Sequence, residues 1–216
     1  MIFQNYDLFL FDFDGLLVNT EPLHFEAYKS TLQKMGYSLS WDFNLYCNYA
    51  HRDQHREALY REFPLLNRDW EGIRKRKNSH YETLLQKVSV PLMPGIEDFL
   101  NELLNHKKKF GVVTNSLKSS IDKIVKKNPT LQKIPYWFTR EDYESPKPHP
   151  DGYLKALEAF SIEANKTIGF EDTLKGLNAL HLAKIKPILI CDPNHPQLKA
   201  SINFPYTHIP TISSIH

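Results

Sequence analysis

Cysteine is scarce in this sequence, with only two among 216 residues. Cys47 and Cys191 lie far apart and lack the spacing of a metal-binding pair. A secreted, disulfide-stabilised fold is therefore not expected, and a reducing, cytoplasmic setting fits best. Long uncharged apolar runs are missing too, so no segment is expected to cross a membrane. Asp7, and no basic residue, precedes the first apolar run, which does not resemble a signal peptide.

An excess of either charge is also missing, because the formal net charge is +2. The overall balance therefore gives no reason to expect a nucleic acid or an anionic membrane as a partner. The basic runs at residues 74–77 and 107–109 are short and are typical of solvated helix faces. Apolar residues make up 41% and charged residues 24% of the chain, as in ordinary globular proteins. The length allows one domain, or one domain with an insertion.

The most informative stretch is residues 8–15, Leu-Phe-Leu-Phe-Asp-Phe-Asp-Gly. Its unbroken apolar start is typical of a strand buried on both faces, as in a parallel sheet. Asp12 and Asp14 then stand at the carboxyl end of that strand, where open α/β sheets bind their ligands. Gly15 allows a tight turn with the backbone close to a ligand. The alternative is a solvated, Asp-rich turn after a core strand.

After Gly15 the pattern changes from strand to helix. Apolar residues recur at helical spacing over residues 21–35, 45–63 and 69–87. A proline-punctuated connector at residues 88–95 ends this region. We therefore predict a helical insertion over residues 16–92, placed within an α/β core made of residues 1–15 and 93–216.

The remainder of the chain alternates between the two patterns. Strands are predicted at residues 110–114, 136–139, 167–170 and 187–191, and helices at residues 96–104, 117–127, 151–160 and 174–183. This alternation predicts an α/β fold, with a doubly wound, Rossmann-like parallel sheet and an inserted α-helical cap. The proline-dotted tail from Pro193 onward is predicted to wrap over the surface.

Polar residues follow three of the predicted strands, and the carboxyl ends of parallel strands meet at one edge of a sheet. These residues are Asp12, Asp14, Thr114, Glu171 and Asp172. Carboxylates from two strand ends can bind a hard cation through oxygen. Lys147 lies between two prolines, so its backbone has little freedom and its ammonium can be aimed. A metal, a lysine, a hydroxyl and a spare carboxylate suit phosphoryl transfer through an aspartyl-phosphate.

These residues also carry a family resemblance. Four ordered segments, Asp12-Phe13-Asp14-Gly15, Thr114, Lys147-Pro148-His149-Pro150-Asp151 and Gly169-Phe170-Glu171-Asp172-Thr173, resemble the motifs of the haloacid dehalogenase superfamily. The helical insertion after the first motif resembles that superfamily's small α-helical cap. The resemblance covers nearly the whole chain.

The resemblance implies a role for each matching residue. Asp12 would be the nucleophile that takes the phosphoryl group. Asp14 would protonate the leaving oxygen and later deprotonate the attacking water. Thr114 and Lys147 would hold the phosphoryl oxygens. The presence of an aspartate two residues after the nucleophile favours phosphate chemistry over dehalogenation.

The resemblance also implies the cofactor and the substrate contacts. The Mg²⁺ ligands would be Asp12, the backbone carbonyl of Asp14, Glu171 and Asp172. Substrate contacts are expected from Gly15 and Asn115, and in the cap from His24, Arg52 and Lys77. The cap segments around those three residues resemble β-phosphoglucomutase-like members of the superfamily. The alternative for each cap residue is an ordinary surface position.

Together these features predict a Mg²⁺-dependent phosphatase that hydrolyses small phosphate esters, with sugar phosphates as the expected substrates. One alternative is a β-phosphoglucomutase-type phosphomutase that uses the same aspartyl-phosphate. Asn19 and Ala50 depart from the usual pattern near two cap residues, which favours hydrolysis. A second alternative is a catalytically idle member that binds a ligand or partner for regulation; the complete set of motif residues argues against it. The sequence leaves the oligomeric state open, and a monomer is compatible with it.

Overall fold

The computed structural model describes residues 2–51, 54–66 and 69–215 and divides into two compact units. The core unit consists of Met1–Asn19 and Pro91–His216, and the cap unit consists of Thr20–Val90. Among the described residues, no helix has both the length and the apolar character that a bilayer crossing requires.

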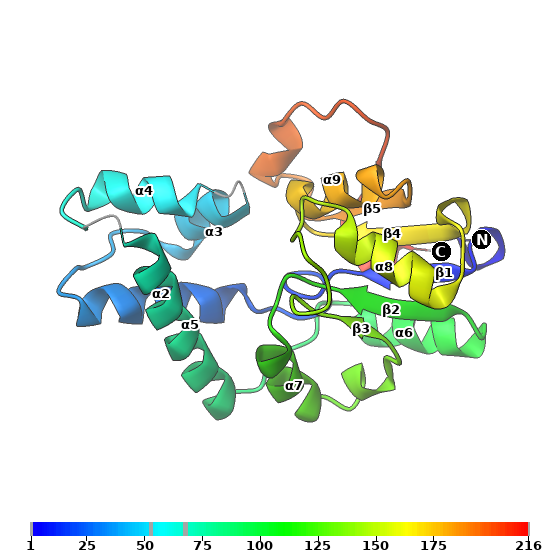
Figure 1. Ribbon diagram of the computed structural model, residues 1–216, viewed down its shortest axis with the longest axis horizontal. Helices are drawn as coiled ribbons and strands as arrows, with labels where there is room; N and C mark the ends of the chain where they lie inside the picture. The colour runs from blue at the N-terminus through cyan, green and yellow to red at the C-terminus, as the bar shows by residue number, and fades with distance from the viewer. Residues whose placement is uncertain (1, 52–53, 67–68, 216) are drawn as a thin grey trace. The chain divides into compact units, whose positions relative to one another are not determined.

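The core unit contains a six-stranded, parallel sheet with the strand order β3-β2-β1-β4-β5-β6 (Figure 1). The strands are β1 (Leu8–Phe11), β2 (Lys109–Val113), β3 (Trp137–Phe138), β4 (Thr167–Glu171), β5 (Lys186–Ile190) and β6 (Thr207–Ile209). Helices cover both faces of the sheet, so the predicted fold class, a doubly wound α/β core, is confirmed.

Strand β1 lies at the centre of this sheet, between β2 and β4. All four of its residues are fully buried. Side chains alternate between the two faces of a strand. Phe11 stacks on Phe170 at 5.0 Å on one face, whereas Leu8 and Leu10 join a cluster on the other. Burial on both faces explains why the strand is apolar at every position.

The core helices form the two outer layers. They are α1 (Ile2–Asn5), α6 (Ile96–Asn105), α7 (Lys118–Lys126), α8 (Asp151–Phe160) and α9 (Leu174–Leu182). Figure 1 shows α6 and α7 on one side of the sheet and α8 and α9 on the other. Tyr153 of α8 and Leu180 of α9 pack in the cluster that contains Leu8 and Leu10.

The cap unit is helical, as predicted, and encloses its own apolar cluster. Its helices are α2 (Glu21–Lys34), α3 (Phe43–His51), α4 (His55–Glu62) and α5 (Trp70–Lys87). The prediction of one helix over residues 45–63 is wrong, because α3 ends at His51 and α4 begins at His55. Tyr46 of α3 and Leu59 of α4 both pack in the same cluster.

The prediction that the tail only wraps the surface is also wrong. Residues Thr207–Ile209 form β6, which pairs with β5 and extends the sheet by one strand. Gln197 and Ile212 are buried within the core unit. The three residues of β6 are only partly buried, so the sequence carries no continuous apolar run that would mark a strand there.

Candidate active site

The site lies where the strand order of the sheet reverses. From β1 the chain proceeds to β2 on one side, and it later returns to β4 on the other side. Ligands of doubly wound sheets bind beyond the carboxyl ends of the strands at such a point. Asp12 directly follows β1, Glu171 is the last residue of β4, and Asp172 directly follows it. The two strands therefore bring three carboxylates together.

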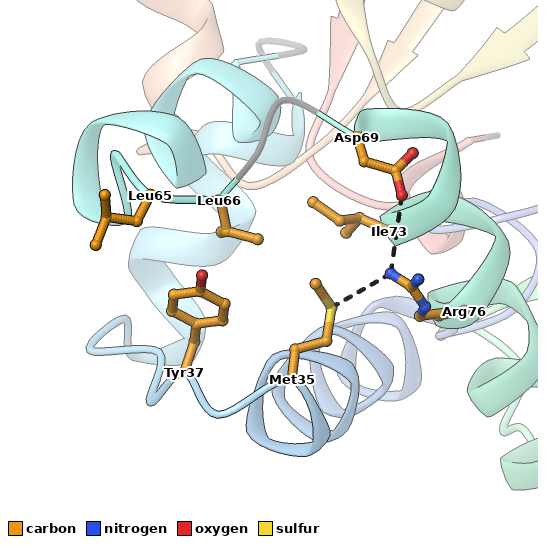
Figure 2. A pocket seen from close by; sticks show the side chains of 7 residues that line it. All are labelled: Met35, Tyr37, Leu65, Leu66, Asp69, Ile73 and Arg76. Atoms are coloured by element: carbon orange, nitrogen blue, oxygen red, sulfur yellow. Dashed lines mark hydrogen bonds and ion pairs between the residues drawn. The ribbon is translucent and has the colours of Figure 1, made fainter.

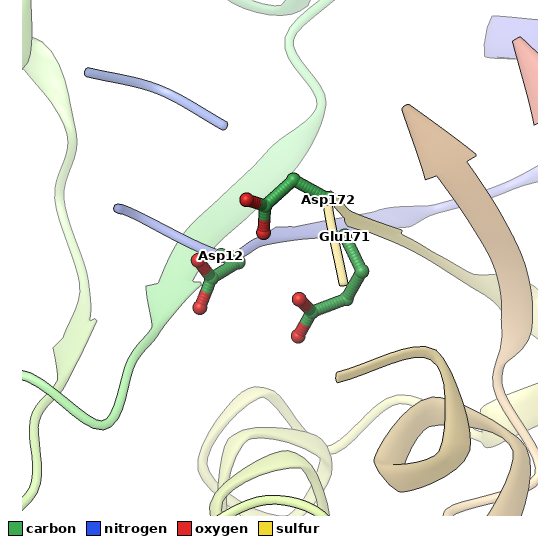
Figure 3. Close-up of side chains that lie close together, drawn as sticks. All are labelled: Asp12, Glu171 and Asp172. Carbon is green, nitrogen blue, oxygen red and sulfur yellow. The ribbon is translucent and has the colours of Figure 1, made fainter. Parts of the chain in front are cut away.

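Figure 3 shows the side chains of Asp12, Glu171 and Asp172 side by side. All three are buried, and one potential ligand atom of each lies within 4.8 Å of the others. Oxygen Oε2 of Glu171 is buried and has no hydrogen-bond partner. A buried carboxylate oxygen without a partner is costly, and a cation would supply the missing interaction. Three oxygen donors of this kind fit a hard divalent ion such as Mg²⁺.

Lys147 joins two of these carboxylates. Its Nζ lies 2.5 Å from Oδ1 of Asp12, 2.7 Å from Oε1 of Glu171 and 2.6 Å from the carbonyl oxygen of Val113. Burial lowers the pKa of Lys147, but the charges of Asp12 and Glu171 outweigh that effect and leave the pKa above its usual value. The side chain is therefore a buried positive charge beside the nucleophile candidate.

The ionisation of Asp12 reflects its crowded surroundings. Burial raises the pKa of Asp12 to about 7, opposed by the charge of Lys147 and assisted by the charges of Glu171 and Asp14. One ammonium cannot balance several buried carboxylates, so the cluster retains excess negative charge. A divalent cation would relieve this excess.

Asp14 and Thr114 are held by the turn that follows β2. The Ser116 hydroxyl donates a short hydrogen bond to Oδ2 of Asp14. The backbone N–H of Ser116 donates to Oγ1 of Thr114 at 3.0 Å. The turn thus links the proposed acid–base residue to the proposed phosphate-binding hydroxyl. Sequence reasoning did not single out Ser116.

Asn115 was predicted to contact the substrate. In the structure its side chain bonds to the backbone of Lys147, with both its oxygen and its nitrogen engaged. A contact between Asn115 and a substrate stays a prediction. Gly15 adopts a φ of +79°, and its missing side chain leaves room for the Asp172 carboxylate.

Two further residues that the sequence did not single out support the site. The hydroxyl of Tyr153 donates to Oε1 of Glu171 at 2.5 Å, and its ring centroid lies 5.0 Å from Nζ of Lys147. The side-chain amide of Gln197 donates to the carbonyl oxygen of Asp172 at 2.7 Å. Tyr153 lies close to the lysine motif in sequence but has the pattern of an ordinary core aromatic, and Gln197 lies in the tail and has no local signal.

The predicted cap residues fall in a different unit, and Arg52 lies outside the described residues. Nζ of Lys77 lies 2.8 Å from Nδ1 of His24. The His24 ring stacks on Tyr81 with a centroid distance of 4.0 Å, and Lys77 is largely buried. The cap unit therefore holds His24 and Lys77 together as a pair.

The cap unit also contains an open cavity of about 380 Å³ (Figure 2). Seven residues line it: Met35, Tyr37, Leu65, Leu66, Asp69, Ile73 and Arg76. None of the predicted site residues is among them. The clustered carboxylates and Lys147 lie in the core unit, at the edge of the sheet, so the candidate active site is placed there and not at this cavity.

Comparison with curated proteins gives several relatives of similar length. A β-phosphoglucomutase of Bacillus subtilis is 24% identical over 212 residues, which cover 96% of this chain and 92% of that protein. A phosphorylated carbohydrates phosphatase of Thermotoga maritima is 22% identical over 179 residues, which cover 83% of this chain and 82% of that protein.

Solved structures share the fold. CbbY from Rhodobacter sphaeroides in complex with phosphate matches with a TM-score of 0.73 and 21% identity, over 97% of this chain and 96% of that chain. A variant of that protein in complex with xylulose-(1,5)bisphosphate matches with a TM-score of 0.73 as well. At this identity the likeness establishes the fold alone.

The family comparison reaches further. The profile of the haloacid dehalogenase-like hydrolases matches residues 9–190, a span that begins in β1 and ends with β5. It includes the three clustered carboxylates and Lys147, which the fold assembles at one sheet edge. The chain therefore belongs to the haloacid dehalogenase-like hydrolase family.

Proposed function

We propose that this protein is a Mg²⁺-dependent phosphatase that hydrolyses small phosphate monoesters, sugar phosphates in particular. The observation that carries the proposal is the buried contact of 2.5 Å between Lys147 and Asp12, beside two further carboxylates at the point where the strand order reverses. Phosphoryl transfer needs a nucleophile, positive charge around the transferred group and a proton donor. The core unit supplies a residue for each need.

The first half of the reaction transfers the phosphoryl group to the protein. An oxygen of Asp12 attacks phosphorus, and the bond between phosphorus and the leaving oxygen breaks. Asp14 gives its proton to that oxygen, so the product leaves as an alcohol. Lys147 and the Thr114 hydroxyl hold the non-bridging oxygens. Ser116 keeps the Asp14 carboxyl oriented through its hydroxyl.

The second half releases phosphate. Asp14, now a carboxylate, takes a proton from water, and the water oxygen attacks phosphorus. The bond between Asp12 and phosphorus breaks, which regenerates both carboxyl groups. When bound by Asp12, Glu171 and Asp172, Mg²⁺ would neutralise charge on the transferred group and on the nucleophile.

The substrate class is supported by the relatives and by the cap. The relatives include a phosphatase of phosphorylated carbohydrates, and the related CbbY variant was solved with a sugar bisphosphate. His24 and Lys77 of the cap unit offer a polar, cationic pair. Such groups suit the hydroxyl and phosphate groups of a sugar ester.

A phosphomutase is the second candidate, since the β-phosphoglucomutase of Bacillus subtilis aligns with 96% of this chain. Both reactions begin with transfer to Asp12, and they differ in whether Asp14 next deprotonates water or a sugar hydroxyl. A mutase must exclude water until the sugar is in place, which a phosphatase need not do.

The deciding experiment assays a panel of hexose, pentose and pentulose phosphates with Mg²⁺ and measures both released phosphate and isomerised product. β-Glucose 1-phosphate is included with a bisphosphate primer. We expect phosphate release from several sugar phosphates without isomerisation. Conversion to glucose 6-phosphate much faster than phosphate release would establish the mutase instead, and no turnover of any ester would rule out both.

A further inference from the structure

We propose that Asn115 is a positioning residue: it clamps the backbone of Lys147 and so aims the ammonium at Asp12 and the transferred phosphoryl group. The inference rests on the proposed function, because it assigns the catalytic use of Lys147 to that reaction. The clamp itself is a structural relationship between the turn after β2 and the loop before α8, both in the core unit.

The loop that carries Lys147 has few ways to be fixed. Proline occupies positions 146, 148 and 150 and has no N–H, so only Ser145, Lys147 and His149 can donate from the backbone of this stretch. Ser145 donates to Asp151 and His149 donates to the carbonyl of Pro146, both within the same segment. Of these three donors, the N–H of Lys147 is the one that bonds outside the segment. Its acceptor is Asn115, in the turn after β2.

Asn115 holds the lysine backbone on both sides. Its Oδ1 accepts from the N–H of Lys147 at 3.0 Å, and its Nδ2 donates to the carbonyl oxygen of Lys147 at 3.3 Å. An amide side chain supplies an acceptor and a donor together, which neither a carboxylate nor an apolar group of this size can do. The residue type therefore matches the clamp.

Tyr143 contacts both Asn115 and the residue before it. Its hydroxyl lies 2.6 Å from the carbonyl oxygen of Thr114 and 3.0 Å from Oδ1 of Asn115. The hydroxyl has a single proton, so the shorter contact to Thr114 takes the larger share of it. Arg140 in turn donates to the carbonyl oxygen of Tyr143 at 2.7 Å. Asn115 is thus held in the orientation in which it bonds to Lys147.

The same turn also holds the other end of the lysine. Nζ donates to the carbonyl oxygen of Val113, two residues before Asn115. Lys147 is consequently fixed at its backbone and at its ammonium by one short segment at the end of β2. A lysine side chain loses rotamer entropy when it is held in one conformation, and a fixed backbone lowers the cost of holding the ammonium in place. Without Asn115, the ammonium of Lys147 would keep its hydrogen-bond partners, but the backbone of Lys147 would no longer be held in place.

The test is a double-mutant cycle between Asn115→Ala and Lys147→Met, assayed on two sugar phosphates with different leaving groups. Because Asn115 acts through Lys147, Asn115→Ala alone should lower kcat/KM by about 10- to 100-fold, equally for both substrates. In the Lys147→Met background the same change should cost almost nothing further. Asn101→Ala, at a partly exposed asparagine bonded to Lys133 and remote in sequence from the site residues, is the matched control and should leave activity unchanged.

Two results would overturn the proposal and favour a direct substrate contact. One is a loss of kcat/KM in the double mutant equal to the product of the two single losses, and the other is a loss that depends on the leaving group. Tyr143→Phe provides a second variant, in case Lys147→Met does not fold. It should lower kcat/KM less than Asn115→Ala does, and it should add little to the loss caused by Asn115→Ala. Independent effects of these two changes would contradict the clamp.

A binding measurement separates this inference from the proposed function. Inorganic phosphate is titrated calorimetrically, with Mg²⁺ present, into the unaltered protein, Asn115→Ala and Asn101→Ala. We expect about a tenfold weaker phosphate affinity for Asn115→Ala alone, since Lys147 would be less well aimed at phosphate oxygens. That result would stand even if no ester were hydrolysed, in which case only the proposed function fails. Equal phosphate affinities in all three proteins would refute the clamp.

Discussion

A side chain at residue 15 would collide with the carboxylate of Asp172, because a Cβ added to Gly15 would overlap Oδ2 of that residue. Gly15 also has a φ of +79°, which side-chain-bearing residues rarely adopt. The glycine of the first motif is therefore required twice, once for the turn after Asp14 and once to leave space for a proposed metal ligand.

Gly15→Ala should accordingly abolish most activity and weaken Mg²⁺ binding. Gly36→Ala is the matched control, since Gly36 has a φ of +84° but nothing within 4 Å of the position that a Cβ would occupy. Both changes should cost about 1–2 kcal/mol of stability through the left-handed backbone. Activity and calorimetric Mg²⁺ affinity, compared at equal folded fraction, check this. Similar activity in both variants would show that the space beside Asp172 is unimportant.

Asp12→Asn should lower turnover by several orders of magnitude while the fold survives, because the amide keeps the shape but lacks the attacking charge. Asp122→Asn, at an exposed ion pair with Lys118 on α7, should change neither activity nor stability appreciably. Steady-state kinetics and thermal unfolding measure both. Beryllium fluoride, a mimic of the phosphoryl group, should bind to Asp12 in the unaltered protein. Substantial residual turnover in Asp12→Asn would exclude the aspartyl-phosphate mechanism.

Removal of divalent cations should abolish activity, and Mg²⁺ should restore it. A site of carboxylate oxygens prefers a hard ion, and Mg²⁺ demands a regular octahedral arrangement. Ca²⁺ tolerates looser geometry and more ligands, so it should bind and inhibit by misplacing the nucleophile. Activity is followed after exhaustive chelation and during titration with each ion. Full activity in the chelated protein would contradict the proposed cofactor.

Mg²⁺ affinity should fall as the pH is lowered below about 7. Burial raises the pKa of Asp12 to about 7 in the metal-free protein, and a carboxyl group must lose its proton to bind the ion. Below that pH each binding event expels a proton, so the apparent affinity should fall about tenfold per pH unit, and it should level off above about pH 8. Calorimetry in buffers of different ionisation enthalpy measures the number of protons released when Mg²⁺ binds. The Asp12→Asn protein should lack this slope, and a flat profile for the unaltered protein would contradict the prediction.

The sheet and its polar edge could be predicted because their signals are local. Strand β1 is apolar at every position since both faces are buried, and the acids that end it stand next to it in sequence. The regular alternation of strands and helices then implies a parallel sheet whose carboxyl ends converge. The carboxylate cluster of Asp12, Glu171 and Asp172 follows from that convergence.

The supporting contacts could not be predicted, because they join residues far apart in the chain through single hydrogen bonds. Asn115 bonds to Lys147 and Gln197 bonds to Asp172, and neither pair leaves a periodic or compositional signal. Tyr153 reads from the sequence as an ordinary core aromatic, since its ring is indeed buried. The roles assigned to individual site residues, and the contacts of His24 and Lys77 with a substrate, stay predictions until the experiments above are done.

The position of β1 has a consequence for the order of events during synthesis. It is the central strand of the sheet and the first to leave the ribosome, yet Leu8 pairs only with Lys109 and Thr167. The nascent apolar strand must therefore wait for both neighbours, while the helical segment between them can build its own local contacts. On a ribosome that is translating this chain, the Leu-Phe-Leu-Phe segment therefore stays without its strand partners until β2 and β4 have both been made.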